Sequence, residues 1–339
     1  MKKLNYNYVV FNVVESKLKL NPNGYYTICL RDLDNIIGIE PIYYPLQHKN
    51  IFLRVLYNLH HSEKINKYIR LPFKQIWFPY LFKGEFDTLK NLCFVFVGRL
   101  SLEYCKYLKS KYPNCKLVFL YRDLKFVTDR LYPELSNNPI FDLQMSIDAV
   151  ESDRYGWVHF DEFESKIDVP ISNNYPESDV FFAGKAKDRL SRLMRAYDIF
   201  TQAGLKCKYY LTGVPQTERK DLPGIEYADK FMSYTEMLYH TVNTRCVLEI
   251  NQEKAVGYTS RFLEAVMFNK RLITDNKDVM KSKFYMPENI LYINKIEDIN
   301  PSFITNEDVV NYNYNNEFSP IHLIERIDTE LMKRYGEKS

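Results

Sequence analysis

Basic side chains gather directly after a glycine in the stretch VFFAGKAKDRL. The apolar run ends at Gly184, and Lys185, Lys187 and Arg189 follow in the loop and the first turn of a predicted helix. Exposed cations at a helix N-terminus are each unfavourable by about 0.3–1 kcal/mol, because they oppose the helix dipole. Three of them favour an anion bound between these side chains and the free backbone N–H groups. The alternative is the solvated basic face of an ordinary helix.

A second glycine precedes a predicted helix in VGYTSRFLEAVMFNKRLITDN. Gly257 would let the backbone approach a phosphate, and Arg261 would add positive charge near the same helix N-terminus. Thr259 is the predicted N-cap, with a hydroxyl that can accept from a free N–H. Glu264, one turn further, can accept hydrogen bonds from both hydroxyls of a ribose. The alternative is a purely structural helix in which Glu264 pairs with Arg261 or Lys270.

The first half of the chain offers a candidate general base. Arg122 and Asp123 follow the apolar run LVFLY, at the predicted carboxyl end of a strand. A carboxylate there can take the proton of a hydroxyl group, a role that contributes about 10²–10⁴ in rate when the base is well placed. Alternatively, Asp123 caps the next helix and pairs with Arg122. Asp148, Asp153 and Arg154 form a second polar cluster in this half.

Histidine and cysteine spacing predicts no metal site. His60, His61 and His240 have no partners at the spacing of metal ligands, and the six cysteines form no C-x-x-C pair. His159 follows Trp157 in an apolar run and is expected to be a core histidine. Unpaired cysteines and the absence of a cleavable N-terminal leader favour a reducing, cytoplasmic location.

Alternating apolar runs and helical patterns predict the fold class. Residues 90–125 read as strand, helix and strand, and the same alternation restarts near residue 180 after a linker at 165–180 that is rich in Pro, Ser and Asn. The prediction is an α/β chain of two Rossmann-like domains that face each other across a cleft. The expected divisions are an acceptor-side domain at 1–170, a donor-binding domain at 171–310 and a closing helix at 311–339 that packs on the first domain.

Charge and hydropathy limit the partners. With 46 Lys or Arg against 43 Asp or Glu, the chain lacks the basic excess of a general nucleic-acid binder. No run of about 20 apolar residues predicts a membrane span. Residues 66–84 mix basic and aromatic side chains, as segments that lie on an anionic membrane do, although buried strands would fit the same pattern.

Taken together, the stretches VFFAGKAKDRLSRLMRAYDIFTQAG, YYLTG and VLEINQEKAVGYTSRFLEAVMFNKRLITDN resemble the donor-binding half of GT-B glycosyltransferases. The nearest resemblance is to bacterial enzymes that build capsule, O-antigen (lipopolysaccharide) and exopolysaccharide. It covers about residues 90–300 and is most specific in the run Gly-Tyr-Thr-x-Arg-x-x-Glu-Ala.

The resemblance implies roles for particular residues. Donor diphosphate would be held by a loop, a helix N-terminus and a basic segment, namely by Gly257, Tyr258, Thr259, Arg261, Gly184, Lys185 and Arg189. Glu264 would hold the ribose, Thr212 and Gly213 would line the same cleft, and the segment IEYADKF would lie near the base. Many retaining members carry another glutamate eight positions before the ribose glutamate. That position is Val256 here, so the stereochemistry stays open.

The expected activity is metal-independent transfer of a sugar from a UDP- or GDP-sugar to a glycan or lipid-linked oligosaccharide, by a cytoplasmic or peripheral membrane enzyme without a further cofactor. Helix dipoles and basic side chains can stabilise the leaving diphosphate. Three alternatives remain: transfer of a polyol phosphate from a CDP donor, epimerisation of a sugar nucleotide, and a non-catalytic scaffold for polysaccharide assembly. A dinucleotide oxidoreductase is disfavoured, because no G-x-G-x-x-G occurs in the first half.

Overall fold

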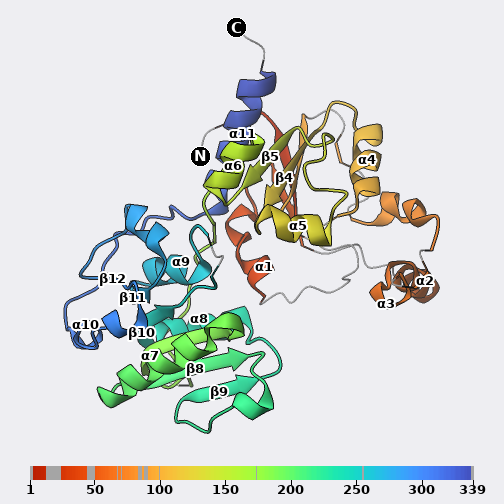
Figure 1. Cartoon of the computed structure of the whole chain (residues 1–339). Coiled ribbons are helices and arrows are strands. Elements are labelled where there is room, and N and C mark those ends of the chain that lie inside the picture. Colours follow the sequence, from red (N-terminus) through yellow and green to blue (C-terminus); the bar gives the residue numbers. More distant parts are fainter. Residues whose placement is uncertain are drawn as a thin grey trace. The chain divides into compact units, whose positions relative to one another are not determined.

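The computed structural model describes residues 3–12, 24–43, 50–66, 68–69, 71–82, 86–87, 91–98, 100–172, 174–253 and 256–336. The chain divides into two units (Figure 1). Unit 1 comprises Met1–Pro22, Tyr26–Phe160 and Ser319–Ser339, and unit 2 comprises Asn23–Tyr25 and Asp161–Phe318.

A parallel sheet of six strands forms the centre of unit 1. In spatial order the strands are β2 (Ile39–Ile42), β1 (Asn7–Phe11), β3 (Leu92–Phe96), β4 (Lys116–Tyr121), β5 (Leu143–Ser146) and β6 (Val158–His159). Helices within residues 1–160 are α1 (Tyr25–Ile28), α2 (Ile51–His61), α3 (Glu63–Asn66), α4 (Leu102–Lys111), α5 (Lys125–Leu131) and α6 (Ala149–Tyr155). Every residue of β3 is buried, as its uninterrupted apolar sequence predicts for a central parallel strand.

Local sequence explains where these helices begin. The Ser101 hydroxyl accepts a hydrogen bond from the Tyr104 N–H at the start of α4, and Asp148 accepts from Val150 and Glu151 at the start of α6. Each side chain satisfies a backbone donor that the helix itself leaves free. The strand–helix–strand unit predicted for residues 90–125 is confirmed as β3, α4 and β4.

Unit 2 holds a second parallel sheet of six strands. Their spatial order is β12 (Ile290–Tyr292), β11 (Arg271–Thr274), β10 (Thr244–Glu249), β7 (Ser178–Lys185), β8 (Cys207–Thr212) and β9 (Ile225–Ala228). The helices are α7 (Leu190–Gln202), α8 (Tyr234–Val242), α9 (Ser260–Met267) and α10 (Ser302–Thr305). From β7 the chain builds outward through β8 and β9, and then crosses to β10 on the other side. In such sheets ligands bind beyond the carboxyl ends of the two strands where the order reverses, here β7 and β10.

Helix α7 covers this sheet with one apolar face. Leu193, Tyr197 and Phe200 are buried, as their helical spacing predicts. The helix ends where expected, because Gly204 adopts a left-handed backbone with φ +77° and Leu205 donates back to the Phe200 carbonyl.

The last helix, α11 (Pro320–Tyr335), belongs to unit 1. Its Asp328 carboxylate accepts hydrogen bonds from the Asn5 N–H at 2.9 Å, the Asn5 side-chain amide at 2.7 Å and the Tyr8 hydroxyl at 2.8 Å. The helix predicted within 311–339 thus packs on the first unit, although it begins only at Pro320 and residues up to Phe318 belong to unit 2. The α/β fold class with two parallel sheets is confirmed. None of the helices in the described ranges has the length and apolar character needed to cross a bilayer.

Candidate functional site

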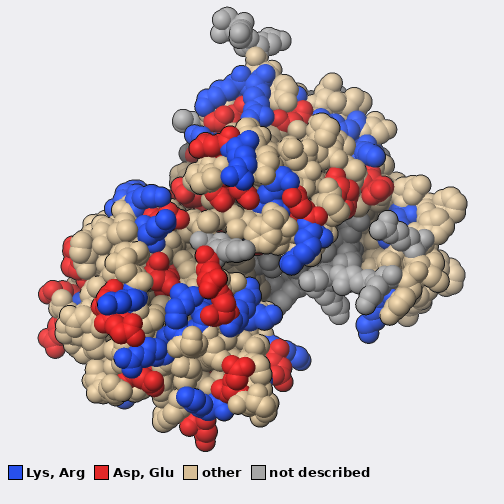
Figure 2. Space-filling view, viewed as in Figure 1, with Lys and Arg blue, Asp and Glu red and all other residues tan. Residues whose placement is uncertain are grey.

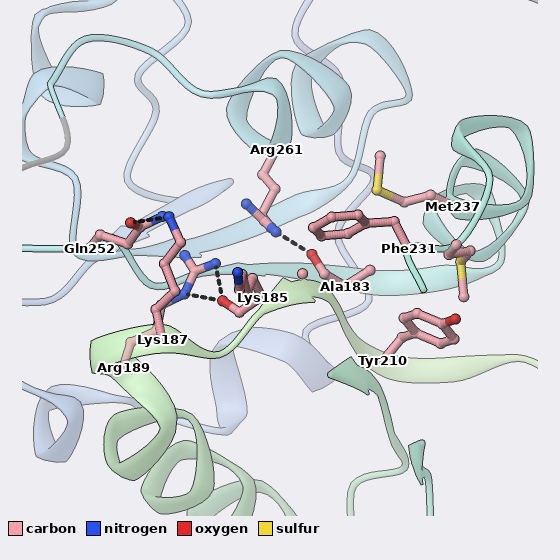
Figure 3. Close-up of a pocket in the computed structure, with 11 residues that line it drawn as sticks. Ala183, Lys185, Lys187, Arg189, Tyr210, Phe231, Met237, Gln252 and Arg261 are labelled. Carbon is pink, nitrogen blue, oxygen red and sulfur yellow. Dashed lines mark hydrogen bonds between the residues drawn. The ribbon is translucent and has the colours of Figure 1, made fainter. Parts of the chain in front are cut away.

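A pocket of about 450 Å³ lies in unit 2 at the carboxyl end of β7 (Figure 3). Its lining comes from β7 and the segment after it, β8, the loop between β9 and α8, α8 itself, the loop after β10, and α9. The lining residues are Ala183, Gly184, Lys185, Lys187, Arg189, Tyr210, Phe231, Met232, Met237, Gln252 and Arg261. The pocket therefore occupies the place where the strand order of the sheet reverses.

Arg261, in the first turn of α9, reaches across to the end of β7. Its guanidinium donates a hydrogen bond to the Ala183 carbonyl and lies 4.8 Å from the centre of the Phe182 ring. A Cβ atom on Gly184 would lie 2.5 Å from Nη2 of Arg261. Glycine at position 184 is thus required for this approach of the guanidinium to the strand.

Arg189 brings a second guanidinium to the same place. It is buried, donates to the Lys185 carbonyl at 3.0 and 3.3 Å and to the Ile250 carbonyl, and lies 5.1 Å from the centre of the Phe182 ring. Burial, together with the charge of Arg261, lowers the pKa of Arg189 to about 10. Burial also lowers the pKa of Arg261. Both cations are therefore held at an electrostatic cost.

Two lysines complete the basic lining. Lys187 has a left-handed backbone with φ +47°, and its ammonium donates to the Gln252 side chain at 2.7 Å. Such a backbone in a residue other than glycine is unfavourable by about 1–3 kcal/mol and is concentrated at functional sites. The stem of Lys185 packs over Gly213, where a Cβ atom would lie 3.0 Å from Cε of the lysine. Four cations thus line the pocket, and its described lining contains no carboxylate.

Two buried carboxyl groups lie near Arg261. Glu249 accepts hydrogen bonds from the hydroxyls of Thr259 and Thr274, whereas Oε1 of Glu264 is buried with no hydrogen-bond partner among the described residues. Burial raises the pKa of Glu264 to about 8, with Arg261 opposing the shift and Glu249 adding to it. Burial likewise raises the pKa of Glu249.

Of the ten residues predicted to hold the donor, Gly184, Lys185, Arg189 and Arg261 line the pocket. The remaining six lie outside its lining: Thr212, Gly213, Gly257, Tyr258, Thr259 and Glu264.

Two of these six make other contacts in unit 2. The Gly257 N–H donates to the Asp278 carboxylate at 3.1 Å, and the Tyr258 ring packs 4.8 Å from that of Phe262. The backbone donor that would approach a phosphate at position 257 is thus already engaged.

Local predictions around α9 need correction. Thr259 is the N-cap residue but makes no side-chain capping bond, because its hydroxyl donates to Glu249 instead. The alternative pairing of Glu264 with Lys270 is not formed, since Lys270 donates to the Val242 carbonyl. Buried Glu249 needs donors and so decides where the threonine points.

The apolar wall of the pocket was largely missed from the sequence. It consists of Tyr210, Phe231 and Met237 (Figure 3), together with Met232. Phe231 ends the segment IEYADKF that was expected near the base, and its side chain is 71% exposed. The aromatic Phe231, in the loop between β9 and α8, was the one available signal, since Tyr210 and Met237 lie within ordinary strand and helix patterns.

In unit 1, Asp123 lies just after β4 and is exposed. Both carboxylate oxygens of Glu151 accept from the Lys125 N–H at the start of α5, at 2.8 and 3.0 Å. Asp148 serves as a helix cap. His159 is exposed, so its prediction as a core histidine is wrong, because β6 lies at the sheet edge. Within the described ranges, no group of three or more His, Cys, Asp or Glu side chains could hold a metal ion.

No family model matches the chain, and no curated protein sequence matches it. The solved structures similar to it include a UDP-N-acetylglucosamine 2-epimerase from Rickettsia bellii, with 11% identity, a TM-score of 0.42, and coverage of 99% of this chain and 98% of that one. A glycosyltransferase from Rickettsia africae has 11% identity and a TM-score of 0.40, with 91% and 88% covered.

A TarM mutant from S. aureus, in complex with fondaparinux, alpha-GlcNAc-glycerol and UDP, has 9% identity and a TM-score of 0.41, with 72% of this chain covered. This chain spans about half of the TarM chain, 52% of its length. At such TM-scores and identities the similarities carry no argument about activity, which has to come from the site. A glycosyltransferase and a sugar-nucleotide epimerase are thus both among the solved structures similar to this two-sheet α/β chain.

Proposed function

We propose that the chain is a glycosyltransferase that uses a nucleotide-sugar donor, and that the donor diphosphate binds in the pocket of unit 2. The observation that carries the proposal is the convergence of Lys185, Lys187, Arg189 and Arg261 on one pocket whose described lining has no carboxylate. Burial of like charges side by side is unfavourable, and a bound polyanion would offset this cost.

The volume and lining of the pocket favour a nucleotide over inorganic phosphate. A volume of about 450 Å³ lies within the range of small-molecule sites. Tyr210, Phe231 and the two methionines offer an apolar surface next to the cations, which suits a planar base attached to a charged diphosphate.

Three of the predicted residues that lie outside the pocket lining have other roles in this proposal. Gly213 gives room for the stem of Lys185, and Thr259, through Glu249, fixes the start of α9 and hence Arg261. Oε1 of Glu264 lacks a donor among the described residues, and a ribose hydroxyl would supply one. We keep Glu264 as the ribose ligand on this ground.

Sugar transfer requires groups that stabilise the leaving diphosphate and a base that accepts the proton of the acceptor hydroxyl. The bond between the anomeric carbon and the diphosphate breaks, and the cations of the pocket stabilise the leaving negative charge without requiring a metal ion. The acceptor hydroxyl forms the new bond and gives its proton to a base. Asp123, an exposed carboxylate at the carboxyl end of β4, is the candidate base in unit 1. The proposed acceptor is a growing bacterial surface glycan carried on a lipid.

Calorimetric titration with UDP, GDP, CDP, CMP and ADP, in EDTA, tests the donor site. We expect selective binding of one diphosphate by the intact protein, and a loss of at least tenfold in affinity for Arg261→Ala. An absence of binding to all five nucleotides would overturn the proposal.

Product analysis then separates the enzyme classes. With the matching nucleotide sugar, a transferase releases free diphosphate in an acceptor-dependent manner. Conversion of the sugar nucleotide to an epimer without an acceptor would contradict the transferase proposal and support epimerisation.

A further inference from the structure

Exposed apolar side chains are concentrated in one short part of unit 1, residues 50–82. Almost half of the large hydrophobic side chains that are exposed among the described residues fall in this part. They are Ile51, Phe52, Leu53, Val55, Leu59, Tyr68, Ile69, Phe73, Ile76 and Tyr80. Large apolar side chains exposed in such number within one short segment are typical of an interaction site.

Helix α2 has apolar side chains on two opposite faces. Tyr57 and His61, one turn apart, are buried, and the Tyr57 ring packs edge-on against Trp77 at 5.4 Å. Ile51, Val55 and Leu59 follow one another at intervals of four residues, and their side chains are 68%, 51% and 45% exposed. At about 100° per residue, this second stripe faces away from the buried one.

The charge of this part of the chain is strongly biased. Residues 50–82 contain five Lys or Arg and one Glu, whereas the whole chain has a formal net charge of only +3. Arg54 and Lys64 are exposed, and the surface over α2 and α3 in Figure 2 is mostly uncharged with a few basic atoms. A second copy of the chain would bring like charges together, whereas an anionic lipid surface would attract them.

Backbone strain points to the same surface. Phe73 has φ +62° and is 67% exposed. Apart from Phe73 and Lys187, the described residues other than glycine with positive φ are all asparagines. A bulky aromatic held in this conformation is a genuine outlier, and such outliers cluster at functional surfaces.

We infer that α2 and the described residues that follow it, up to Tyr80, form a docking surface for an anionic lipid bilayer. Ile51, Phe52, Val55 and Leu59 enter the headgroup region, and Arg54 and Lys64 pair with lipid phosphates. The structure thereby extends the surface expected at 66–84 toward the N-terminus, onto α2. The inference does not depend on the nucleotide pocket, which lies in unit 2.

Co-sedimentation of the full chain with vesicles tests this. The vesicles consist of phosphatidylcholine, alone or with about one third phosphatidylglycerol. We expect binding to the anionic vesicles and a decrease of at least tenfold in the partition coefficient for the combined variant Phe52→Ser, Val55→Ser, Leu59→Ser. Ile37→Ser, which changes a side chain in the same unit that is 93% exposed, should bind within about twofold of the wild type.

The charge is tested separately with Arg54→Gln combined with Lys64→Gln, which should lower binding to anionic vesicles several-fold and weaken its dependence on salt. An unchanged hydrogen-exchange pattern of β1 and β3 in the triple serine variant would show that unit 1 is folded. Unchanged nucleotide binding would keep this test distinct from that of the donor site. Equal vesicle binding by the wild type and the triple variant would overturn the inference. A dimer in sedimentation velocity that the triple variant dissociates would also overturn it and assign the surface to a second copy.

Discussion

At the scale of single residues, the backbone at Gly184 passes close to two guanidinium groups. A Cβ atom at this position would lie 2.5 Å from Nη2 of Arg261 and 3.3 Å from Nη2 of Arg189. Both arginines donate to backbone carbonyls at the ends of β7 and β10, so neither guanidinium can shift without losing a hydrogen bond. Because position 184 has no side chain, the guanidinium groups of Arg261 and Arg189 can both lie at this end of β7.

Replacement of this glycine should affect binding more than folding. Gly184→Ala is expected to displace Arg261 from the Ala183 carbonyl and to weaken nucleotide binding at least tenfold, as measured by calorimetry. Gly204→Ala is the matched control. A Cβ atom there meets nothing within 4 Å, but φ +77° makes the change unfavourable by about 1–2 kcal/mol in stability. The interpretation fails if both variants bind nucleotide equally well.

Glu264 should make stability fall as the pH rises. Its carboxyl has a normal pKa of 4.5, raised by burial to about 8 in the folded chain. Between these two values the unfolded chain has lost the proton that the native state keeps, so the free energy of unfolding decreases with increasing pH. Glu264→Gln removes this contribution, and its urea unfolding should decline less steeply between pH 5 and 8 than that of the wild type. Parallel declines for the two proteins would contradict the raised pKa.

At the scale of elements, β10, α9 and β11 meet at Glu249. The carboxylate ends β10 and accepts from Thr259, just before α9, and from Thr274, the last residue of β11. Because Glu249 is buried, both hydrogen bonds are made away from water. This three-way contact places the first turn of α9, and so Arg261, relative to the sheet.

Loss of one of these donors should destabilise unit 2. Thr274→Val leaves Oε2 of Glu249 without this hydrogen bond, at a cost of about 1–3 kcal/mol. Thr241→Val is a suitable control, because that buried hydroxyl donates to the Met237 carbonyl inside α8. Urea unfolding followed by circular dichroism measures both. The contact would have little importance if Thr274→Val cost no more than Thr241→Val.

At the scale of the whole molecule, both described ends of the chain belong to unit 1. The chain builds unit 2 between β6 and α11, and Asp328 on α11 then binds Asn5 and the Tyr8 hydroxyl close to the start of the chain. Each unit has apolar clusters of its own. Helix α11 of unit 1 therefore follows the sheet of unit 2 in the chain, so unit 1 is complete only after the chain of unit 2 has been synthesised.

Removal of this carboxylate should weaken one unit selectively. Asp328→Ala is expected to lower the stability of unit 1 by on the order of 3 kcal/mol, since several hydrogen bonds to a charged group are lost. Hydrogen exchange should show earlier opening of β1 and β3, with unit 2 and its nucleotide binding unchanged. Glu330→Ala, which removes ion pairs to Arg326 and Lys333 on the same helix, should cost less than 1 kcal/mol. Equal opening of both units would contradict this picture.

The sequence by itself determined the local elements and the charge. Uninterrupted apolar runs identified central strands such as β3 and β4, and helical spacing identified α7 together with its end at Gly204. These features depend on neighbours a few residues apart, so they are visible in the chain without its fold. The basic stretch after β7 was visible for the same reason.

Only the tertiary structure decided which side chains meet. Gly184 and Arg261 are far apart in sequence and come together because β7 and β10 are neighbours in the sheet. Phe231 joins them from a turn that has no periodic pattern. Thr259 turned to Glu249 because a buried carboxylate requires donors, a demand that arises only once the strands have assembled. The lining of a pocket follows strand order, and strand order is a long-range property that no local pattern records.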